Sequence, residues 1–486
     1  MISKVSSAVL VGVEPREVSV EARAGGSKEG FSLAGLPDAS VREAKHRVRS
    51  ALAQAGTNAS QTIIVHLGPA ALPKRGSAFD LPIALAVLGA LKRDAAVPPI
   101  VAAGELAMDG AVLPTNGALA AALVARELGV PCLLHPEMAA QAACVSGVEL
   151  RPVRTLIEAH GVALGRATAP RVPEWVVGIE DVFDMSDVRG QAYARRAIEI
   201  AAAGGHHVVL NGPPGCGKTM LARRLPGLLP PLSESEALDV ACVWSAADRW
   251  RPPGSPPPFR APHHSASLAA VLGGGSGIPV PGELSLAHGG VLFLDELGEY
   301  PSNLLDSFRQ PIEQGTITIS RKGATVTYPA SCQVVAATNP CPCGFLGDRI
   351  KQCRCGEAAV AKYRRRLSGP LLDRFDLRVT MSRPEQLDGP PGEPSEAIRN
   401  RVMAAREIQR MRGRLNRDLP GAALDELAVS DRAQRMLRVA VDRGILTGRG
   451  YDRSRRVART IADLAGADTV GADHVAEAMS LRGEAA

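Results

Sequence analysis

The residues best suited to chemistry lie in one short stretch, GPPGCGKT. It consists of Gly212, Pro213, Pro214, Gly215, Cys216, Gly217, Lys218 and Thr219 and matches the pattern G-x-x-x-x-G-K-T. A β-branched segment precedes it and a helical segment follows, which is the context a phosphate-binding loop requires. The glycines let backbone N–H groups turn toward phosphate oxygens, and the helix N-terminus adds a favourable dipole. The motif predicts that Lys218 reaches the β- and γ-phosphates of ATP and that Thr219 holds Mg²⁺, with Cys216 filling space in the loop.

Two further apolar segments end in polar residues downstream of this loop. GGVLFLDELGEY (289–300) carries Asp295 and Glu296, and QVVAATNP (333–340) carries Asn339. Asp295 is predicted to bind the Mg²⁺ water shell, and Glu296 to polarise the attacking water as a general base. Asn339 is predicted to sense the γ-phosphate. The order of these motifs indicates an ATPase site.

Three arginines are candidates for contacts with phosphate. Arg374 in SGPLLDRFDL lies between two acids, so it is either part of a surface salt bridge or an arginine finger presented to the ATP of a neighbouring subunit. An arginine finger is worth on the order of 10³–10⁵ in rate, and supply in trans would make a ring the working state. Arg449 in LTGRGYDRSRRVART is the candidate lid arginine, with Arg453 as the second choice.

Four of the nine cysteines stand in CPCGFLGDRIKQCRC, directly after Asn339 and before Arg374. Four thiolates can close a tetrahedral Zn²⁺ site and stabilise a small loop. The C-x-C spacing is tighter than the usual C-x₂₋₄-C, so free thiols and a redox switch remain alternatives. The predicted zinc clasp holds the sensor strand and Arg374 in register. Its ligands are Cys341, Cys343, Cys353 and Cys355.

Composition sets limits on the class of protein. The 486 residues suffice for two to four domains, and 45% hydrophobic with 22% charged residues is ordinary for a globular protein. A net charge of +6 is too mild to establish a nucleic-acid partner, and 3% aromatic residues argue against recognition by base stacking. No apolar run approaches the roughly 18 residues of a membrane span, and no secretion signal is evident. We therefore expect a cytoplasmic protein with reduced thiols and no membrane partner.

The chain divides into three expected domains. Residues 1–165 alternate strand-like and helix-like segments, which predicts an α/β domain. A proline-dotted linker covers 166–183, the ATPase core covers 184–385, and residues 395–486 are expected to form an all-helical lid domain.

The amino-acid sequence of these motifs resembles that of the magnesium-chelatase-like AAA+ family, which includes the competence protein ComM and YifB. The resemblance covers nearly the whole chain and rests on the following phrases: FSLAGLPDASVREAKHRVRSAL, GELAMDGAVLP, GPPGCGKTMLARRLPGLLPPL, FRAPHHSAS, PGELSLAHGGVLFLDEL, RQPIEQG, AATNPCPCG, LSGPLLDRFDL and RVARTIADL. It implies an AAA+ P-loop NTPase core and a Lon-peptidase-like (ribosomal-protein-S5-like) N-terminal domain. The Lon Ser–Lys pair is absent here, because Ser77 is the only nearby serine and NGALAAALVAREL holds no lysine.

The resemblance also implies a homo-hexameric, ATP-driven motor on single-stranded or branched DNA, bound without sequence specificity. The implied activity is branch migration in recombination or natural transformation. A magnesium-chelatase-type ATPase subunit and an ATP-dependent chaperone or protease ring remain alternatives. As in related rings, the hairpin expected at 317–330 would present Arg321 and Lys322 to DNA in a central channel.

Two other features stay ambiguous. Seven arginines between Arg399 and Arg417 either form a stripe that binds phosphate backbone or a solvated helix face. His263 and His264 are either metal ligands or part of a buried or strained turn, and the turn is the better explanation.

Overall fold

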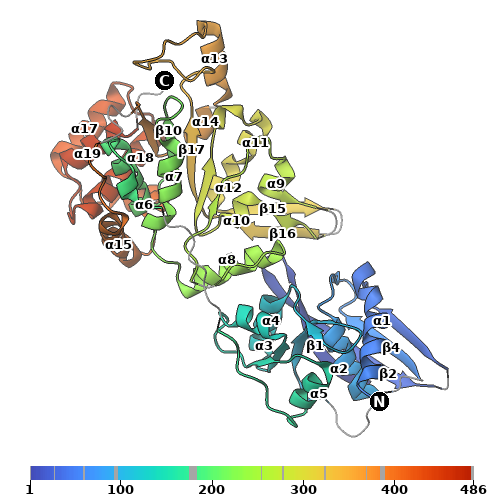
Figure 1. The fold of residues 1–486 in the computed structure, drawn as a ribbon. Helices are drawn as coiled ribbons and strands as arrows, with labels where there is room; N and C mark the ends of the chain where they lie inside the picture. Colours follow the sequence, from blue (N-terminus) through green and yellow to red (C-terminus); the bar gives the residue numbers. More distant parts are fainter. Residues whose placement is uncertain are drawn as a thin grey trace.

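The computed structural model describes residues 2–26, 28–57, 61–91, 97–174, 183–252, 254–275, 278–321, 324–367, 369–383 and 389–482. Figure 1 shows an N-terminal part in blue to teal, a central part in green to orange and a C-terminal helical part in red. Among the helices in these ranges, none combines the length and apolar character needed to cross a bilayer.

A mixed seven-stranded sheet forms the N-terminal part, with strand order β3-β4-β2-β1-β5-β8-β9. β1 pairs antiparallel with β2 and parallel with β5, so the expected α/β class is confirmed, while the Lon-like assignment stays a prediction. The strands are β1 (Ile2–Val11), β2 (Glu14–Gly25), β3 (Gly30–Ala34), β4 (Thr62–Gly68), β5 (Val101–Ala103), β8 (Cys132–Leu134) and β9 (Leu150–Pro152), and β6 (Glu105–Leu106) pairs with β7 (Val112–Leu113). The helices are α1 (Ala39–Gln54), α2 (Asp80–Leu91), α3 (Ala118–Leu128), α4 (Pro136–Ala142) and α5 (Leu156–Ala163).

The central part is built on a parallel five-stranded sheet with strand order β11-β14-β17-β10-β18. Its middle strands are apolar because helices cover both faces. The strands are β11 (Phe259–Arg260), β14 (Val291–Leu294), β17 (Gln333–Thr338), β10 (Val208–Asn211) and β18 (Leu377–Thr380). The helices are α6 (Ala192–Gly204), α7 (Lys218–Arg224), α8 (Glu234–Ala246), α9 (Leu268–Leu272), α10 (Glu283–Leu286), α11 (Ser302–Ser307), α12 (Arg309–Gln314), α13 (Glu357–Arg366) and α14 (Gly369–Leu372), with 3-10 turns η1 (Met185–Asp187), η2 (Pro226–Leu228) and η3 (Leu297–Glu299).

Two small antiparallel pairs extend from this sheet. β12 (Gly273–Gly274) pairs with β13 (Val280–Pro281), and β15 (Thr316–Arg321) pairs with β16 (Ala324–Pro329) as the predicted hairpin. Figure 1 shows the hairpin projecting to one side of the central part. Its expected tip residue Lys322 lies outside the described residues.

The N-terminal part packs directly on this hairpin. Gly12, in the turn between β1 and β2, has φ +69°, and a Cβ built there would lie 2.6 Å from Cγ1 of Val326. Ala241 and Cys242 of α8 join an apolar cluster of the N-terminal part. Asn116 donates a hydrogen bond to Asp248 at 3.1 Å. The hairpin is therefore packed against a folded domain along β16.

The C-terminal part is all-helical, as expected. Its helices pack on α6 and share one apolar cluster with the central sheet. They are α15 (Ser395–Met411), α16 (Gly421–Asp425), α17 (Asp431–Asp442), α18 (Gly448–Leu464) and α19 (Ala472–Ser480), with the 3-10 turn η4 (Asn416–Asp418).

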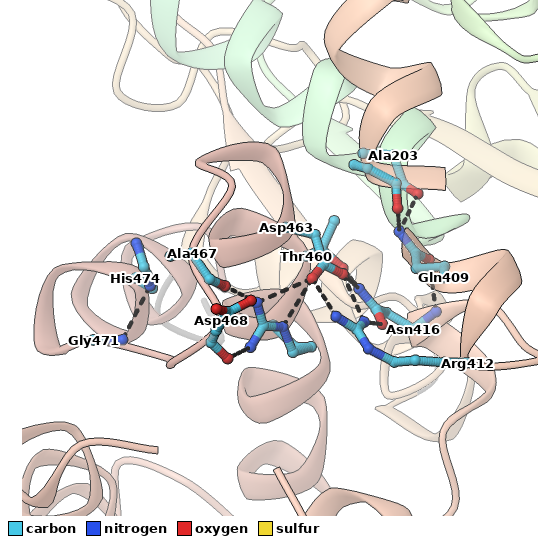
Figure 2. A network of polar contacts seen from close by, with 12 residues as sticks. Ala203, Gln409, Arg412, Asn416, Thr460, Asp463, Ala467, Asp468, Gly471 and His474 are labelled. Atoms are coloured by element: carbon cyan, nitrogen blue, oxygen red, sulfur yellow. Dashed lines mark hydrogen bonds and ion pairs between the residues drawn. The ribbon is translucent and has the colours of Figure 1, made fainter. Parts of the chain in front are cut away.

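Most of the arginines of 399–417 are occupied by contacts within the chain, so they form neither a continuous stripe for DNA nor a fully solvated face. Five of the seven are hydrogen bonded or ion paired to other parts of the chain. Arg410 and Arg414 are exposed, and Arg410 pairs with Glu407 on the surface of α15. Arg406 donates to the Ala202 carbonyl at the C-terminal end of α6, where unpaired carbonyls attract cationic donors. Arg412 binds Asp463, whose side chain is fully buried, within the network of Figure 2. The positive charges therefore attach the C-terminal helices to one another and to the central part.

Candidate nucleotide-binding site

The phosphate-loop motif connects β10 to α7, as its sequence predicts. Gly215 and Gly217 have φ of +79° and +96°, the left-handed region that favours glycine. A Cβ at Gly212 would lie 2.6 Å from the Met381 carbonyl oxygen and 2.9 Å from the Cys216 sulfur. The loop therefore needs Gly215 and Gly217 for their positive φ angles and Gly212 because a side chain there would not fit. The buried Cys216 fills the space beside Gly212.

Lys218 is held inside the loop. Its Nζ donates to the carbonyl oxygens of Gly212 at 2.6 Å and Pro213 at 3.1 Å. It also donates to Oδ1 of Asn339 at 3.2 Å. Burial lowers the pKa of Lys218 from its ordinary value, and the nearby acids Asp295 and Glu296 oppose that shift. A phosphate entering the loop would replace weak carbonyl partners with a full negative charge.

Thr219 and Asp295 meet at the carboxyl edge of the sheet. The Thr219 hydroxyl donates to Oδ2 of Asp295 at 3.0 Å, and Oδ1 of Asp295 accepts the backbone N–H of Glu296 at 2.9 Å. Because β10, β14 and β17 are parallel neighbours, the residues that follow them gather at one edge. A hydroxyl and a carboxylate are hard oxygen donors, so this pair fits Mg²⁺.

Glu296 has a strained backbone and a partner that we did not expect. Its φ is +51°, an uncommon conformation for a residue with a side chain. Nδ1 of His264 lies 3.2 Å from Oε2 of Glu296, and the His264 ring stacks near His263 at 4.1 Å between centroids. The strained turn therefore lies at Glu296, and His264 orients the carboxylate. No sequence signal connected these residues, which are far apart in the chain.

Gln191 is a second residue that the sequence analysis missed. It has φ +51° directly before α6, and its side-chain amide donates to the carbonyl oxygens of Cys216 at 3.2 Å and Ser382 at 2.5 Å. It thus ties the phosphate loop to the segment that follows β18. A glutamine between Gly190 and Ala192 gives no local indication of such a role.

The three predicted arginines differ in their surroundings in this single chain. Nη2 of Arg374 is paired with Oε1 of Glu313 at 2.7 Å. Arg449 is exposed in the first turn of α18. Arg453 is largely buried, with Nε 3.9 Å from Asp376 and Nη1 3.4 Å from the Phe375 carbonyl. Their predicted roles toward phosphate stay predictions. Arg321, the other predicted DNA contact, is exposed at the end of β15.

The four cysteines of the CPCGFLGDRIKQCRC loop converge on one point. Sγ–Sγ distances among Cys341, Cys343 and Cys353 are 3.4–3.6 Å, and the four sulfurs, including that of Cys355, lie within 4.8 Å of one another. A zinc ion with Zn–S bonds of 2.3 Å would set sulfurs about 3.8 Å apart. Hydrogen bonds from the backbone N–H groups of Arg354 and Phe345 lower the pKa of Cys343 to about 6. The donor set fits a tetrahedral thiolate-bound ion.

This cysteine loop also touches the phosphate loop. A Cβ at Gly344 would lie 2.7 Å from Cδ of Pro214, so the backbone of one loop is in direct contact with the proline ring of the other. Arg383, just after β18, binds Asp348 of the cysteine loop at 2.8 Å. The cysteine cluster and the candidate ATP site are therefore linked by direct contacts.

Comparison with known proteins defines the family. The family models "Subunit ChlI of Mg-chelatase", "Magnesium chelatase, subunit ChlI" and "Magnesium chelatase, subunit ChlI C-terminal" match residues 18–139, 184–388 and 392–482. The competence protein ComM of Haemophilus influenzae is 40% identical over 98% of this chain and 97% of its own length. This chain belongs to the magnesium-chelatase-like family of ComM and YifB.

Other members of the ComM/YifB family show the same full-length similarity. YifB of Escherichia coli K12 is 39% identical over 99% of this chain and 97% of its own length. A protein of Mycobacterium tuberculosis H37Rv without a described function is 42% identical over 99% of this chain and 98% of its own length. The mixed α/β architecture with a parallel central sheet and a helical C-terminal part agrees with this AAA+ family, whose members are ATPase-like.

Proposed function

We propose that this chain is an ATP-hydrolysing AAA+ motor that acts on DNA as a homo-hexameric ring, with branch migration in recombination or natural transformation as its activity. The observation that carries the ATPase half is the convergence of Lys218, Thr219, Asp295 and Asn339 at one sheet edge. The DNA half is supported by full-length similarity to a competence protein.

In the proposed mechanism each residue has a distinct task. The phosphate-loop backbone and Lys218 bind the β- and γ-phosphates. Thr219 and Asp295 would hold Mg²⁺, which would neutralise charge on the phosphates. Glu296, oriented by His264, accepts a proton from the attacking water. Asn339, which is hydrogen bonded to Lys218, senses the γ-phosphate. Arg374 exchanges Glu313 for the ATP of a neighbouring subunit.

The cysteine cluster has a supporting role in this proposal. A Zn²⁺ ion held by its four thiolates would fold the loop that touches Pro214 and leave the hydrolytic groups unchanged. The basis is the close approach of the sulfurs and the Gly344 contact with the phosphate loop.

Two alternative functions are a magnesium-chelatase-type subunit and an ATP-dependent protease. A magnesium-chelatase-type subunit that drives metal insertion is favoured by the descriptions of the matching family models. An ATP-dependent protease is disfavoured, because the hydroxyl of Ser77 lies 3.3 Å from that of Thr115, and a Ser–Thr pair supplies no general base.

The test is the ATPase rate with and without forked or four-way-junction DNA at low and moderate salt. Stimulation by branched DNA in the wild type, abolished by Lys218→Ala, is the expected result. A well-formed ring that neither binds DNA nor responds to it would refute the DNA motor. Size-exclusion chromatography that shows only monomer with a non-hydrolysable ATP analogue would refute the trans-acting Arg374.

A further inference from the structure

Nearly all the net charge of the chain is concentrated in one short segment. Residues 346–367 contain seven of the 56 Lys and Arg residues and two of the 50 Asp and Glu residues, so they contribute +5 of the formal net charge of +6. The remaining residues are almost balanced. We call this segment, which spans most of the cysteine loop and α13, the basic arm.

The cations of the basic arm face solvent. Each of the seven residues is exposed, three in the cysteine loop and four on α13: Arg349, Lys351, Arg354, Lys362, Arg364, Arg365 and Arg366. Of the two acids, Asp348 has a side chain only 1% exposed and is bound by Arg383. Glu357 lies in the first turn of α13, at the other end of the helix from the arginine run. The exposed charge of the arm therefore consists of seven cations and one acid.

The basic arm is attached firmly enough to present these charges. α13 buries the ring of Tyr363, whose atoms leave no room for a Cβ at Gly298, the nearest being 2.5 Å away. Lys351 and Arg383 lie over the Phe345 ring at 5.2 and 5.7 Å. Figure 1 shows α13 at the end of the central part opposite the N-terminal part and away from the β15–β16 hairpin.

We propose that the basic arm binds the phosphate backbone of a nucleic acid, as a contact separate from the hairpin. This inference rests on the proposed DNA motor and adds a second site to it. Seven cations gathered on one exposed segment favour a polyanionic partner, because a polyanion gains affinity from each cation through counterion release. A Zn²⁺ tetrathiolate would bring a formal charge of −2 to the base of the arm. The four cations of α13 lie beyond that cluster in the chain and keep their charge.

The test compares two variants with equal loss of charge. The arm variant replaces Lys362, Arg364, Arg365 and Arg366 with Gln, which preserves helix propensity and leaves Tyr363 in place. The control variant replaces four exposed arginines of the C-terminal part with Gln: Arg432, Arg435, Arg438 and Arg443. Binding of fluorescein-labelled duplex and forked DNA is titrated from about 50 to 200 mM salt with a non-hydrolysable ATP analogue. Melting temperature and light scattering verify fold and oligomeric state.

The arm variant is expected to lose about 3 from the slope of log affinity against log salt, since each phosphate contact contributes about 0.7–0.9. Between about 50 and 200 mM salt, the fold-loss of DNA affinity in the arm variant would then be about 60 times smaller than that in the wild type. The control variant is expected to retain the wild-type slope. Equal slopes for wild type and arm variant, or equal losses in both variants, overturn the proposal. An arm variant that forms no ring yet binds DNA with the wild-type slope would show that the arm contacts a neighbouring subunit. That result would also overturn the proposal. A wild type that binds no DNA refutes the motor itself.

Discussion

Replacing Gly344 with alanine tests whether the cysteine loop holds the phosphate loop in shape. Gly344 has φ +81°, and a Cβ there would lie 2.7 Å from Cδ and 2.9 Å from Cγ of Pro214. Ordinary carbon–carbon contacts begin at about 3.5 Å, so the two loops must separate by about 0.8 Å. A proline ring has no rotamer that swings aside, so the backbone of the phosphate loop takes up the displacement.

The expected magnitude follows from what this displacement disturbs. Hydrogen bonds to charged groups contribute about 1.5–3 kcal/mol each, so the loss of one between the loop and ATP weakens binding by about 10- to 150-fold. The positive φ adds about 1–2 kcal/mol of strain for alanine, but that strain is present with and without ATP. It therefore lowers stability and leaves ATP affinity unaffected.

Gly347→Ala is the matched control. Gly347 lies in the same loop with φ +78°, and a Cβ there meets nothing within 4 Å. It carries the same backbone strain without contact to Pro214. Equilibrium binding of a fluorescent ATP analogue to both variants, with melting temperature alongside, separates the two effects. Equal ATP affinity in Gly344→Ala and Gly347→Ala would refute the mechanical link between the loops.

Three further predictions follow from other parts of the structure. Glu296→Gln is expected to reduce hydrolysis by about 10²–10⁴ while ATP stays bound, and a variant that hydrolyses at the wild-type rate would exclude Glu296 as the base. Cys353→Ser is expected to abolish zinc binding, measured by elemental analysis of protein purified without chelator; a metal-free wild type would contradict this. Burial lowers the pKa of His207 to about 3. Below about pH 6.5 the unfolded chain therefore binds a proton that the folded chain does not. The free energy of unfolding consequently falls by about 1.4 kcal/mol per pH unit as the pH is lowered from about 6.5 to 3. His207→Asn, whose side-chain oxygen can accept the Val334 N–H in place of Nδ1, should flatten this slope in urea titrations, and an unchanged slope would contradict the assignment.

Much of the fold was predictable because its signals are local. Apolar segments such as 333–338 are buried strands, and the phosphate-binding motif is a contiguous stretch whose glycines dictate its own turn. The parallel arrangement then brings Asp295 and Asn339 to Thr219 and Lys218 by a general rule for such sheets. The helical C-terminal part follows equally from its amphipathic periodicity.

Other features depended on contacts between residues distant in the chain. The contact of His264 with Glu296, the double hydrogen bond of Gln191 and the seat of Gly344 on Pro214 carry no local pattern. The arginines illustrate the reason most clearly. A guanidinium is equally suited to a buried carbonyl, a carboxylate or a phosphate, so the sequence determines how many cations there are, and packing decides which remain exposed. The α6 carbonyl ends and buried acids take up most of the cations of 399–417, whereas α13 buries Tyr363 and leaves its four cations exposed.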